Sequence, residues 1–245
     1  MRTCDILLEK KASKIKYLIS KKVGKAIKDY DMIQDRDKIV VAVSGGKDSL
    51  SLLEILRDRQ RYAPIKFELL PVHIKLDFQK IDVDRLEKYF KENNYNYHIE
   101  PLNILNDNDK IDCFYCAWNR KKTIFEVASR FGIKKIFLAH HKDDIIETFL
   151  LNLIFHAEIG TITPIEKFFD GRFWVIRPLM YVEEKEIVKF ADLYNLPVLN
   201  FDCQYQGSKR RFIKDLLKTL ENEVNKHAKS NIFNALKRVK KDYLL

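Results

Sequence analysis

The run Ser-Gly-Gly-Lys-Asp-Ser at residues 44–49 combines residue types that hold phosphate groups and a divalent cation. It follows an apolar stretch, IVVAV at 39–43, and precedes an apolar pattern with helical spacing. Adjacent glycines let a backbone turn tightly and bring N–H groups against an anion, and the next helix adds its positive end. A carboxylate such as Asp48 shares Mg²⁺ with phosphate oxygens. The run therefore predicts a nucleotide-phosphate site between a strand and a helix.

Two familiar glycine motifs do not account for this loop. A Walker A loop needs a glycine five residues before Gly46, where Val41 stands, and the G-x-G-x-x-G pattern does not fit. A turn with a helix N-cap at Asp48 or Ser49 explains the geometry, but not glycines, a carboxylate and a hydroxyl in one run. We therefore interpret the run as a phosphate loop.

Cysteines form a second group of candidates, at positions 4, 113, 116 and 203. Cys113 and Cys116 lie one helical turn apart at the start of an expected helix, whose N-terminus lowers thiol pKa values. A bare C-x-x-C fits half of a zinc site, a redox dithiol or coincidence, so spacing alone leaves these alternatives open.

Charged residues follow in two places. Arg120, Lys121 and Lys122 come within about one turn of the cysteine pair. Asp143 and Asp144 open a helix after a strand-like run, where they cap the helix and interact favourably with its dipole. That structural role is compatible with a catalytic one.

The elements that must position these residues alternate between strand-like and helical patterns. Strands are predicted at 39–43, 67–74, 95–102 and 135–140, with helices at 49–59, 80–92, 117–131 and 144–156. A later strand is predicted at 173–179 and a helix at 183–195. This order indicates an α/β fold with a doubly wound, mostly parallel sheet, in which ligands bind at the carboxyl ends of the strands.

Helical extensions flank this pattern. Residues 10–30 have helical apolar spacing among many lysines, which fits a solvated face and a phosphate-contacting face equally well. Beyond Cys203 the chain is helical and basic. We divide it into an N-terminal basic segment (1–38), a nucleotide-binding domain (39–200) and a C-terminal basic segment (201–245).

Composition limits the class of protein. Apolar residues make up 46% of the 245-residue chain, and no apolar run approaches the roughly 20 residues that span a bilayer. Asp5 and Glu9 interrupt the first apolar stretch, so no signal-peptide pattern is present and we expect a cytoplasmic protein. The net charge of +10 suits a polyanionic partner.

The phosphate loop closely resembles the pyrophosphate loop of the N-type ATP pyrophosphatases, which cleave ATP between the α and β phosphates and adenylate a substrate. With C-x-x-C, its trailing basic residues and A-H-H-K-D-D at 139–144, the chain resembles the tRNA 2-thiocytidine synthetase group over about residues 35–220. The resemblance implies an adenine nucleotide α-hydrolase-like, PP-loop fold. Ala139 and Gln204 depart from the usual glycine and proline, and only Cys4 precedes the loop, which favours the 2-thiocytidine branch over the 2-thiouridine branch.

ATP and Mg²⁺ are the first cofactors that the resemblance implies. The β and γ phosphates would contact the loop, and Asp48 would hold Mg²⁺. His73 and Ile74, which end the second strand, would border the adenosine. The implied ATP and Mg²⁺ residues are Ser44, Gly45, Gly46, Lys47, Asp48, Ser49, His73, Ile74 and Asp143.

The resemblance also implies a [4Fe-4S] cluster on Cys113, Cys116 and Cys203, with one iron open to hydrosulfide. A structural zinc site that adds Cys4 is the competing interpretation. Asp144 would act in catalysis near the adenylated base, and Arg120 or Lys121 would offset charge on the adenylated oxygen.

The implied substrate is tRNA, at cytidine 32 in the nearest branch, with sulfide or a persulfide or thiocarboxylate carrier as sulfur donor. Lys209, Arg210 and Arg211 are predicted to contact the RNA backbone, and the apolar C-terminal face to be core or homodimer contact. The alternatives are a tRNA 2-thiouridine synthetase, a tRNA lysidine synthetase-like ligase, a non-tRNA adenylating enzyme and a non-enzymatic zinc RNA-binding protein.

Overall fold

A computed structural model describes residues 3–77, 82–103, 113–199, 208–240 and 242. They form two compact units. The first contains the described residues within 1–141 and 164–203, and the second those within 142–163 and 204–245. The predicted division at residues 38 and 200 remains a prediction.

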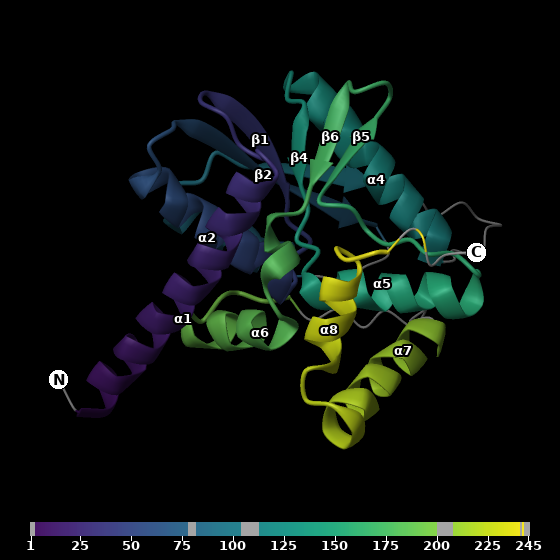
Figure 1. Cartoon of the computed structure of the whole chain (residues 1–245). Coiled ribbons are helices and arrows are strands. Elements are labelled where there is room, and N and C mark those ends of the chain that lie inside the picture. Colours follow the sequence, from purple (N-terminus) through teal and green to yellow (C-terminus); the bar gives the residue numbers. More distant parts are fainter. Residues whose placement is uncertain (1–2, 78–81, 104–112, 200–207, 241, 243–245) are drawn as a thin grey trace. The chain divides into compact units, whose positions relative to one another are not determined.

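A six-stranded sheet organises the first unit, in the order β3-β2-β1-β4-β6-β5 (Figure 1). All neighbouring pairs are parallel except β5 and β6. The strands are β1 (Asp37–Ala42), β2 (Phe67–Leu76), β3 (His98–Leu102), β4 (Lys135–Phe137), β5 (Ile165–Phe168) and β6 (Phe173–Ile176). The doubly wound, mostly parallel sheet predicted from the sequence is confirmed.

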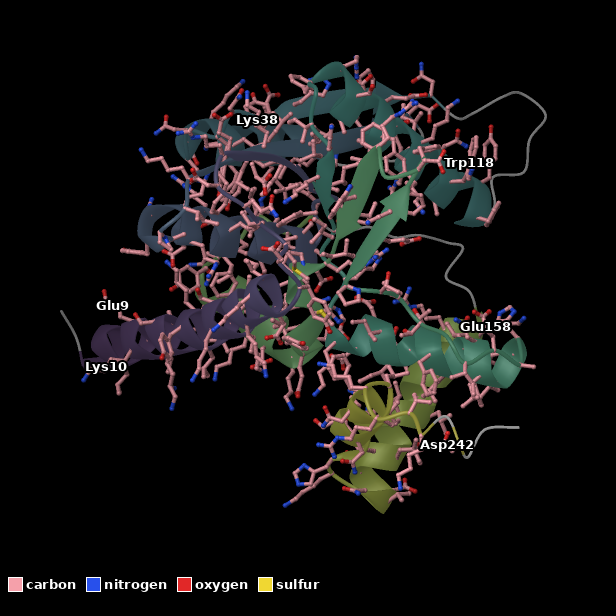
Figure 2. The ribbon with its side chains drawn as sticks, turned by 45° about the horizontal axis from the view of Figure 1, so that its top comes forward. Glu9, Lys10, Lys38, Trp118, Glu158 and Asp242 are labelled. Carbon is pink, nitrogen blue, oxygen red and sulfur yellow. The ribbon has the colours of Figure 1, made fainter. Side chains whose placement is uncertain are left out.

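Helices connect these strands. Those of the first unit are α1 (Thr3–Asp29), α2 (Lys47–Tyr62), α3 (Val83–Glu92), α4 (Cys113–Arg130), the 3₁₀ turn η1 (Pro178–Tyr181) and α6 (Glu184–Leu193). The exposed residues Glu9 and Lys10 mark the first half of α1 in Figure 2. In the described part of the chain no helix has the length and apolarity needed to cross a membrane.

Both faces of the sheet are covered. Every second residue of β2, at positions 70, 72, 74 and 76, lies on one face of the sheet. These residues pack with Val40 and Val175 against α4, whose Phe125 and Val127 join that core. The other face carries α2, which contacts β1 and β2, and α6 and α1 pack against α2. Burial on both faces explains the nearly continuous apolar strands.

The strand order reverses beside β1, because β2 lies on one side of it and β4 on the other. In open α/β sheets such a reversal, at the carboxyl ends of the strands, is where ligands bind. The loop at 44–46 follows β1 directly and leads into α2. The topology therefore places the predicted phosphate loop at the ligand-binding edge of the sheet.

Several element boundaries differ from the sequence prediction, and one strand is additional. The edge strand β5 was not predicted, because its four residues have no clear alternation. The predicted strand at 135–140 ends at Phe137, and the predicted helix at 10–30 already begins at Thr3. Two lysines of α1 pair with carboxylates of its own unit, Lys16 with Asp58 and Lys22 with Glu186, so part of this basic face is structural.

The second unit is helical. It contains α5 (Lys142–Phe155), α7 (Ser208–Thr219), the π-helical turn η2 (Leu220–Val224) and α8 (Ala228–Ala235). α5 packs against α7 and α8, and Ile213, Leu217 and Phe233 are buried. These three side chains of the apolar face predicted for the C-terminal segment therefore belong to the core of this unit, whereas Phe212, Val224 and Val239 are exposed.

Candidate functional site

The loop after β1 turns through Gly45, whose φ of 88° lies in the left-handed region. The N–H of Leu199 donates to the Gly45 carbonyl at 2.9 Å, which fixes the loop from outside. Gly46 is the N-cap of α2 and has no side chain to occupy the first amides of that helix. These amides and the helix dipole therefore favour an anion next to the loop.

The two serines of the loop bond to each other and to its backbone. Ser49 Oγ donates to the Gly46 carbonyl at 2.9 Å, and the Ser44 and Ser49 hydroxyl oxygens are 3.2 Å apart. The Gly46 N–H points to Ser44 Oγ at 3.3 Å. The loop is held in one shape by contacts within residues 44–49, which reduces the ordering needed for a phosphate to bind.

Asp48 provides the acidic group at this loop. Its Oδ1 is buried, and among the described residues no donor reaches it within hydrogen-bonding distance; His141 Nε2 lies 3.7 Å away. A buried carboxylate oxygen without a donor favours a cation. Oxygen donors are the ligands that Mg²⁺ prefers, so Asp48 fits a metal that also binds phosphate.

Lys47 points to carboxylates. Its Nζ lies 3.2 Å from Asp48 Oδ2 and 3.0 Å from Glu184 Oε1 at the start of α6. Burial opposes its charge, but Asp48 and Glu184 outweigh burial and raise the pKa of Lys47 above its ordinary value. The predicted role of Lys47 at phosphate requires this ammonium to turn from the carboxylates.

His73 and Ile74 are buried in the C-terminal half of β2, just beyond the stretch of β2 that pairs with β1. The His73 Nδ1 lies 2.8 Å from the Val43 carbonyl, so Nδ1 carries the proton and Nε2 is the acceptor. Burial, together with the positive charges of Arg120 and Lys75, lowers the pKa of His73, so its ring is neutral at pH 7. Among the described residues no hydrogen-bond partner meets the buried Nε2, which leaves it available to a ligand.

Arg120 reaches this neighbourhood from α4, since its charge acts on His73 and its Nε is buried. Lys121 lies elsewhere: its ammonium stacks over Phe168 of β5, 3.9 Å from the ring centroid. Of the two basic residues predicted to offset charge, Arg120 is therefore the one brought near the nucleotide residues of β2.

The cysteine pair occupies the first turn of α4, which begins at Cys113. Cys116 is half-buried and packs against the core between α4 and the sheet. A helix N-terminus favours thiolates, the form that binds metal, so this position fits a metal cluster. Cys203 lies outside the described residues, and within them no group of three His, Cys, Asp or Glu side chains converges on a metal position.

Asp143 and Asp144 open α5 in the second unit, where both are paired. Lys229 of α8 lies 3.0 Å from Asp143. Arg210 of α7 donates to Asp144 through Nη2 and, through Nε at 2.8 Å, to Glu147. Arg210, which was predicted to contact RNA, is thus paired with Asp144, which was predicted to act in catalysis.

Burial opposes ion pairing in this cluster. It raises the pKa of Glu147, although Arg210 and Lys214 act in the opposite direction. For Arg210, burial is outweighed by Asp144 and Glu147, which raise the pKa of the guanidinium. Lys209 and Arg211 are exposed, with Lys209 Nζ 5.2 Å from the Phe155 ring centroid.

Three contacts at the loop were not predicted from the sequence: His141 beside Asp48, Glu184 on Lys47, and Leu199 on Gly45. Each joins residues far apart in the chain, and of the three partners only His141 belongs to a motif that the sequence shows, A-H-H-K-D-D. Arg177, which directly follows β6, is a buried structural residue, bonded to Glu166 at 2.8 Å and to His140 Nδ1 at 3.2 Å.

Comparison with known proteins adds independent observations. The model of the PP-loop domain family matches residues 15–211. Over 236 residues the chain is 37% identical to the tRNA-cytidine(32) 2-sulfurtransferase of Geotalea uraniireducens (strain Rf4), covering 93% of each protein. The protein of the same name from Geobacter sulfurreducens is also 37% identical, with 93% of this chain and 91% of the relative covered.

Among solved structures, the chain is similar to the U34-tRNA thiolase NcsA from Methanococcus maripaludis, determined with its [4Fe-4S] cluster. The TM-score is 0.76 at 20% identity, covering 93% of this chain and 79% of that one. At this identity the match shows that the two proteins share a fold.

Proposed function

We propose that this chain, which belongs to the PP-loop domain family, thiolates cytidine 32 of tRNA. Within that family it belongs to the group of tRNA thiolation enzymes named tRNA-cytidine(32) 2-sulfurtransferases. ATP activates the base, and sulfur replaces the 2-oxygen. The relatives match this chain over nearly its whole length, which supports carrying over the activity and not the fold alone.

The phosphate loop carries the ATP part of this proposal. A left-handed glycine, the first amides of α2 and the buried Asp48 Oδ1 lie within five residues of one another. The amides suit the β and γ phosphates, and Asp48 would hold a Mg²⁺ ion that offsets their negative charge. This combination favours cleavage between the α and β phosphates, with pyrophosphate leaving towards the loop.

Activation of the base makes and breaks one bond. The 2-oxygen of the cytosine attacks the α phosphorus, the bond to the bridging oxygen breaks, and pyrophosphate leaves. Arg120, near His73, offsets negative charge during this step. His73 stays neutral and offers Nε2 as an acceptor to the nucleotide.

Sulfur transfer then replaces AMP. Hydrosulfide adds to C2 and AMP departs with the oxygen, so the step needs no oxidant or reductant. When bound to Cys113, Cys116 and Cys203, a [4Fe-4S] cluster supplies an iron coordination site for the hydrosulfide. Cys116 packs against the core and its backbone is helical, which supports a fixed position for this proposed ligand.

Iron content tests the ligand set. Protein purified without oxygen should contain iron and absorb broadly near 400 nm, and Cys203→Ala should lose the iron. Cys4→Ala is the matched control and should keep it. Zinc in place of iron, or loss of metal in the control, would favour a structural zinc site.

Pyrophosphate release distinguishes a tRNA thiolation enzyme from a small-molecule adenylating enzyme and from a non-enzymatic RNA-binding protein. The proposal expects release that depends on tRNA containing cytidine 32. Release without tRNA would favour the small-molecule enzyme, and its absence under all conditions would favour the RNA-binding protein.

A further inference from the structure

One flank of α4 exposes aromatic rings instead of burying them. Phe114 and Trp118 are 78% and 51% exposed, and they are neighbours because residues four apart share a helix face. Figure 2 shows Trp118 on the outward side of α4. Single exposed aromatics are ordinary, but two adjacent rings on one helix form a surface that a partner can cover.

Cations lie among these rings. Lys122 Nζ is 5.7 Å from the Trp118 ring centroid, and the exposed Lys121 reaches over Phe168. Phe169, on the turn after β5, is largely exposed, and its ring centroid lies 5.3 Å from that of Phe125 of α4. Glu126 lies 3.8 Å from Lys122 and offsets only part of this charge.

We propose that this α4 flank, defined as Phe114, Trp118, Lys121, Lys122 and Phe169, binds unpaired nucleotides of an RNA loop. Bases stack on the rings and the ammonium groups contact phosphates. The proposal rests on the proposed function, because it specifies which part of the substrate tRNA binds to the α4 flank.

Charge favours RNA over an apolar protein partner. A protein that buried the rings would also desolvate the lysines, at a cost unless it supplied matching carboxylates. A single-stranded RNA offers both parts at once, since every base has a stacking face and every nucleotide a negative charge.

Position favours a loop. A base that is modified inside a folded tRNA must leave its stack, and its neighbours then lose a stacking partner. The flank belongs to the helix that begins with the cysteine pair. A helix is about 10 Å across, so an RNA loop that crosses α4 reaches both the α4 flank and the end of the helix that carries the cysteine pair.

Tryptophan fluorescence tests stacking directly, because the chain has two tryptophans, Trp118 and Trp174. In Trp174→Phe, an RNA hairpin with the anticodon loop of the substrate tRNA should quench the emission of Trp118. A fully paired duplex of equal length should quench it much less. In Trp118→Phe, whose only tryptophan is Trp174, the hairpin should leave the emission nearly unchanged.

Affinity provides the second readout. Trp118→Ala should weaken hairpin binding by about tenfold or more, and Phe114→Ala by a similar factor. Lys122→Gln should weaken binding to hairpin and duplex alike and reduce its salt dependence. Tyr62→Ala is the control, since Tyr62 is an aromatic residue at the end of α2 that is as exposed as Phe114, and it should leave the affinity unchanged.

Two results would overturn the proposal while the proposed function stands: thiolation with unchanged hairpin affinity in Trp118→Ala, or shielding of Trp118 from acrylamide in the free protein. A change of oligomeric state in Trp118→Ala would instead assign the flank to a second copy of the chain. If the unmodified protein neither binds the hairpin nor thiolates tRNA, the proposed function fails as well.

Discussion

Arg210 of α7 forms an ion pair with Asp144 of α5 and a second one with Glu147, one turn further along α5. The Glu147 carboxylate is buried and that of Asp144 is partly buried, whereas the Arg210 side chain is half exposed. The guanidinium therefore neutralises two acidic groups of the second unit from its surface. That Arg210 contacts the RNA backbone stays a prediction from the sequence, whereas this pairing gives the residue a structural role.

Replacement of Arg210 tests that role. Arg210→Gln leaves the buried Glu147 without its closest cation, and we expect the free energy of unfolding to fall by about 1–3 kcal/mol, less than for a fully buried pair. Arg211→Gln, at the exposed neighbouring position, should change it by about 0.5 kcal/mol or less. Urea unfolding measures both, and equal effects would refute the structural role.

The two glycines of the phosphate loop should respond differently to alanine. Gly45 has a positive φ, so Gly45→Ala should lower the free energy of unfolding by about 1–3 kcal/mol. Gly46 has a φ of −75°, and an added Cβ would lie 3.4 Å from Ser44 Oγ. Gly46→Ala should therefore be tolerated far better, which thermal unfolding of the two variants checks; a larger loss at Gly46 would contradict this loop geometry.

His73 makes stability depend on pH. Burial lowers its pKa below the ordinary 6.5, with help from Arg120 and Lys75. As the pH falls below 6.5, the unfolded chain takes up a proton before the folded one does, so the free energy of unfolding decreases. His73→Asn keeps a donor for the Val43 carbonyl without a titrating ring.

Urea unfolding at about pH 7.5 and pH 5.5 measures this effect. The unmodified protein should lose more stability on acidification than His73→Asn does. Equal losses in the two proteins would show that the pKa of His73 is not lowered in the folded state.

Asp48 should matter for ATP chemistry more than for folding. Asp48→Asn removes the negative charge that we propose binds Mg²⁺. We expect pyrophosphate release to fall by a factor on the order of 10². Asp58→Asn is the matched control on the same helix, where the carboxylate pairs with Lys16. Its pyrophosphate release should stay near that of the unmodified protein, and an equal loss in both variants would remove Asp48 from the metal site.

Much of the fold could be predicted because β1, β2 and the helices between the strands have strong local patterns. The strand β5 could not, since four residues stabilised by pairing with β6 leave little local pattern. The loop at 44–49 was predicted as a unit because its residues are contiguous. His141, Glu184 and Leu199 contact it from positions far along the chain, and such contacts follow from the assembled sheet and not from spacing.

The cluster around Arg210 illustrates the same limit. A basic run such as Lys209–Arg211 indicates a polyanion partner when read as composition. Helix packing brings the Arg210 guanidinium to Asp144 of α5, although half of the side chain stays exposed, as Lys209 and Arg211 are. Sequence alone does not separate the three, because the acidic partners of Arg210 stand more than 60 residues earlier.

The central claim is tested most directly by incubating anaerobically purified protein with ATP, Mg²⁺, sulfide and unmodified tRNA, and analysing the nucleosides by mass spectrometry. We predict 2-thiocytidine that requires ATP and that disappears when cytidine 32 is replaced by another base. A cluster-loaded protein that forms no 2-thiocytidine, or that thiolates a uridine instead, would contradict the account.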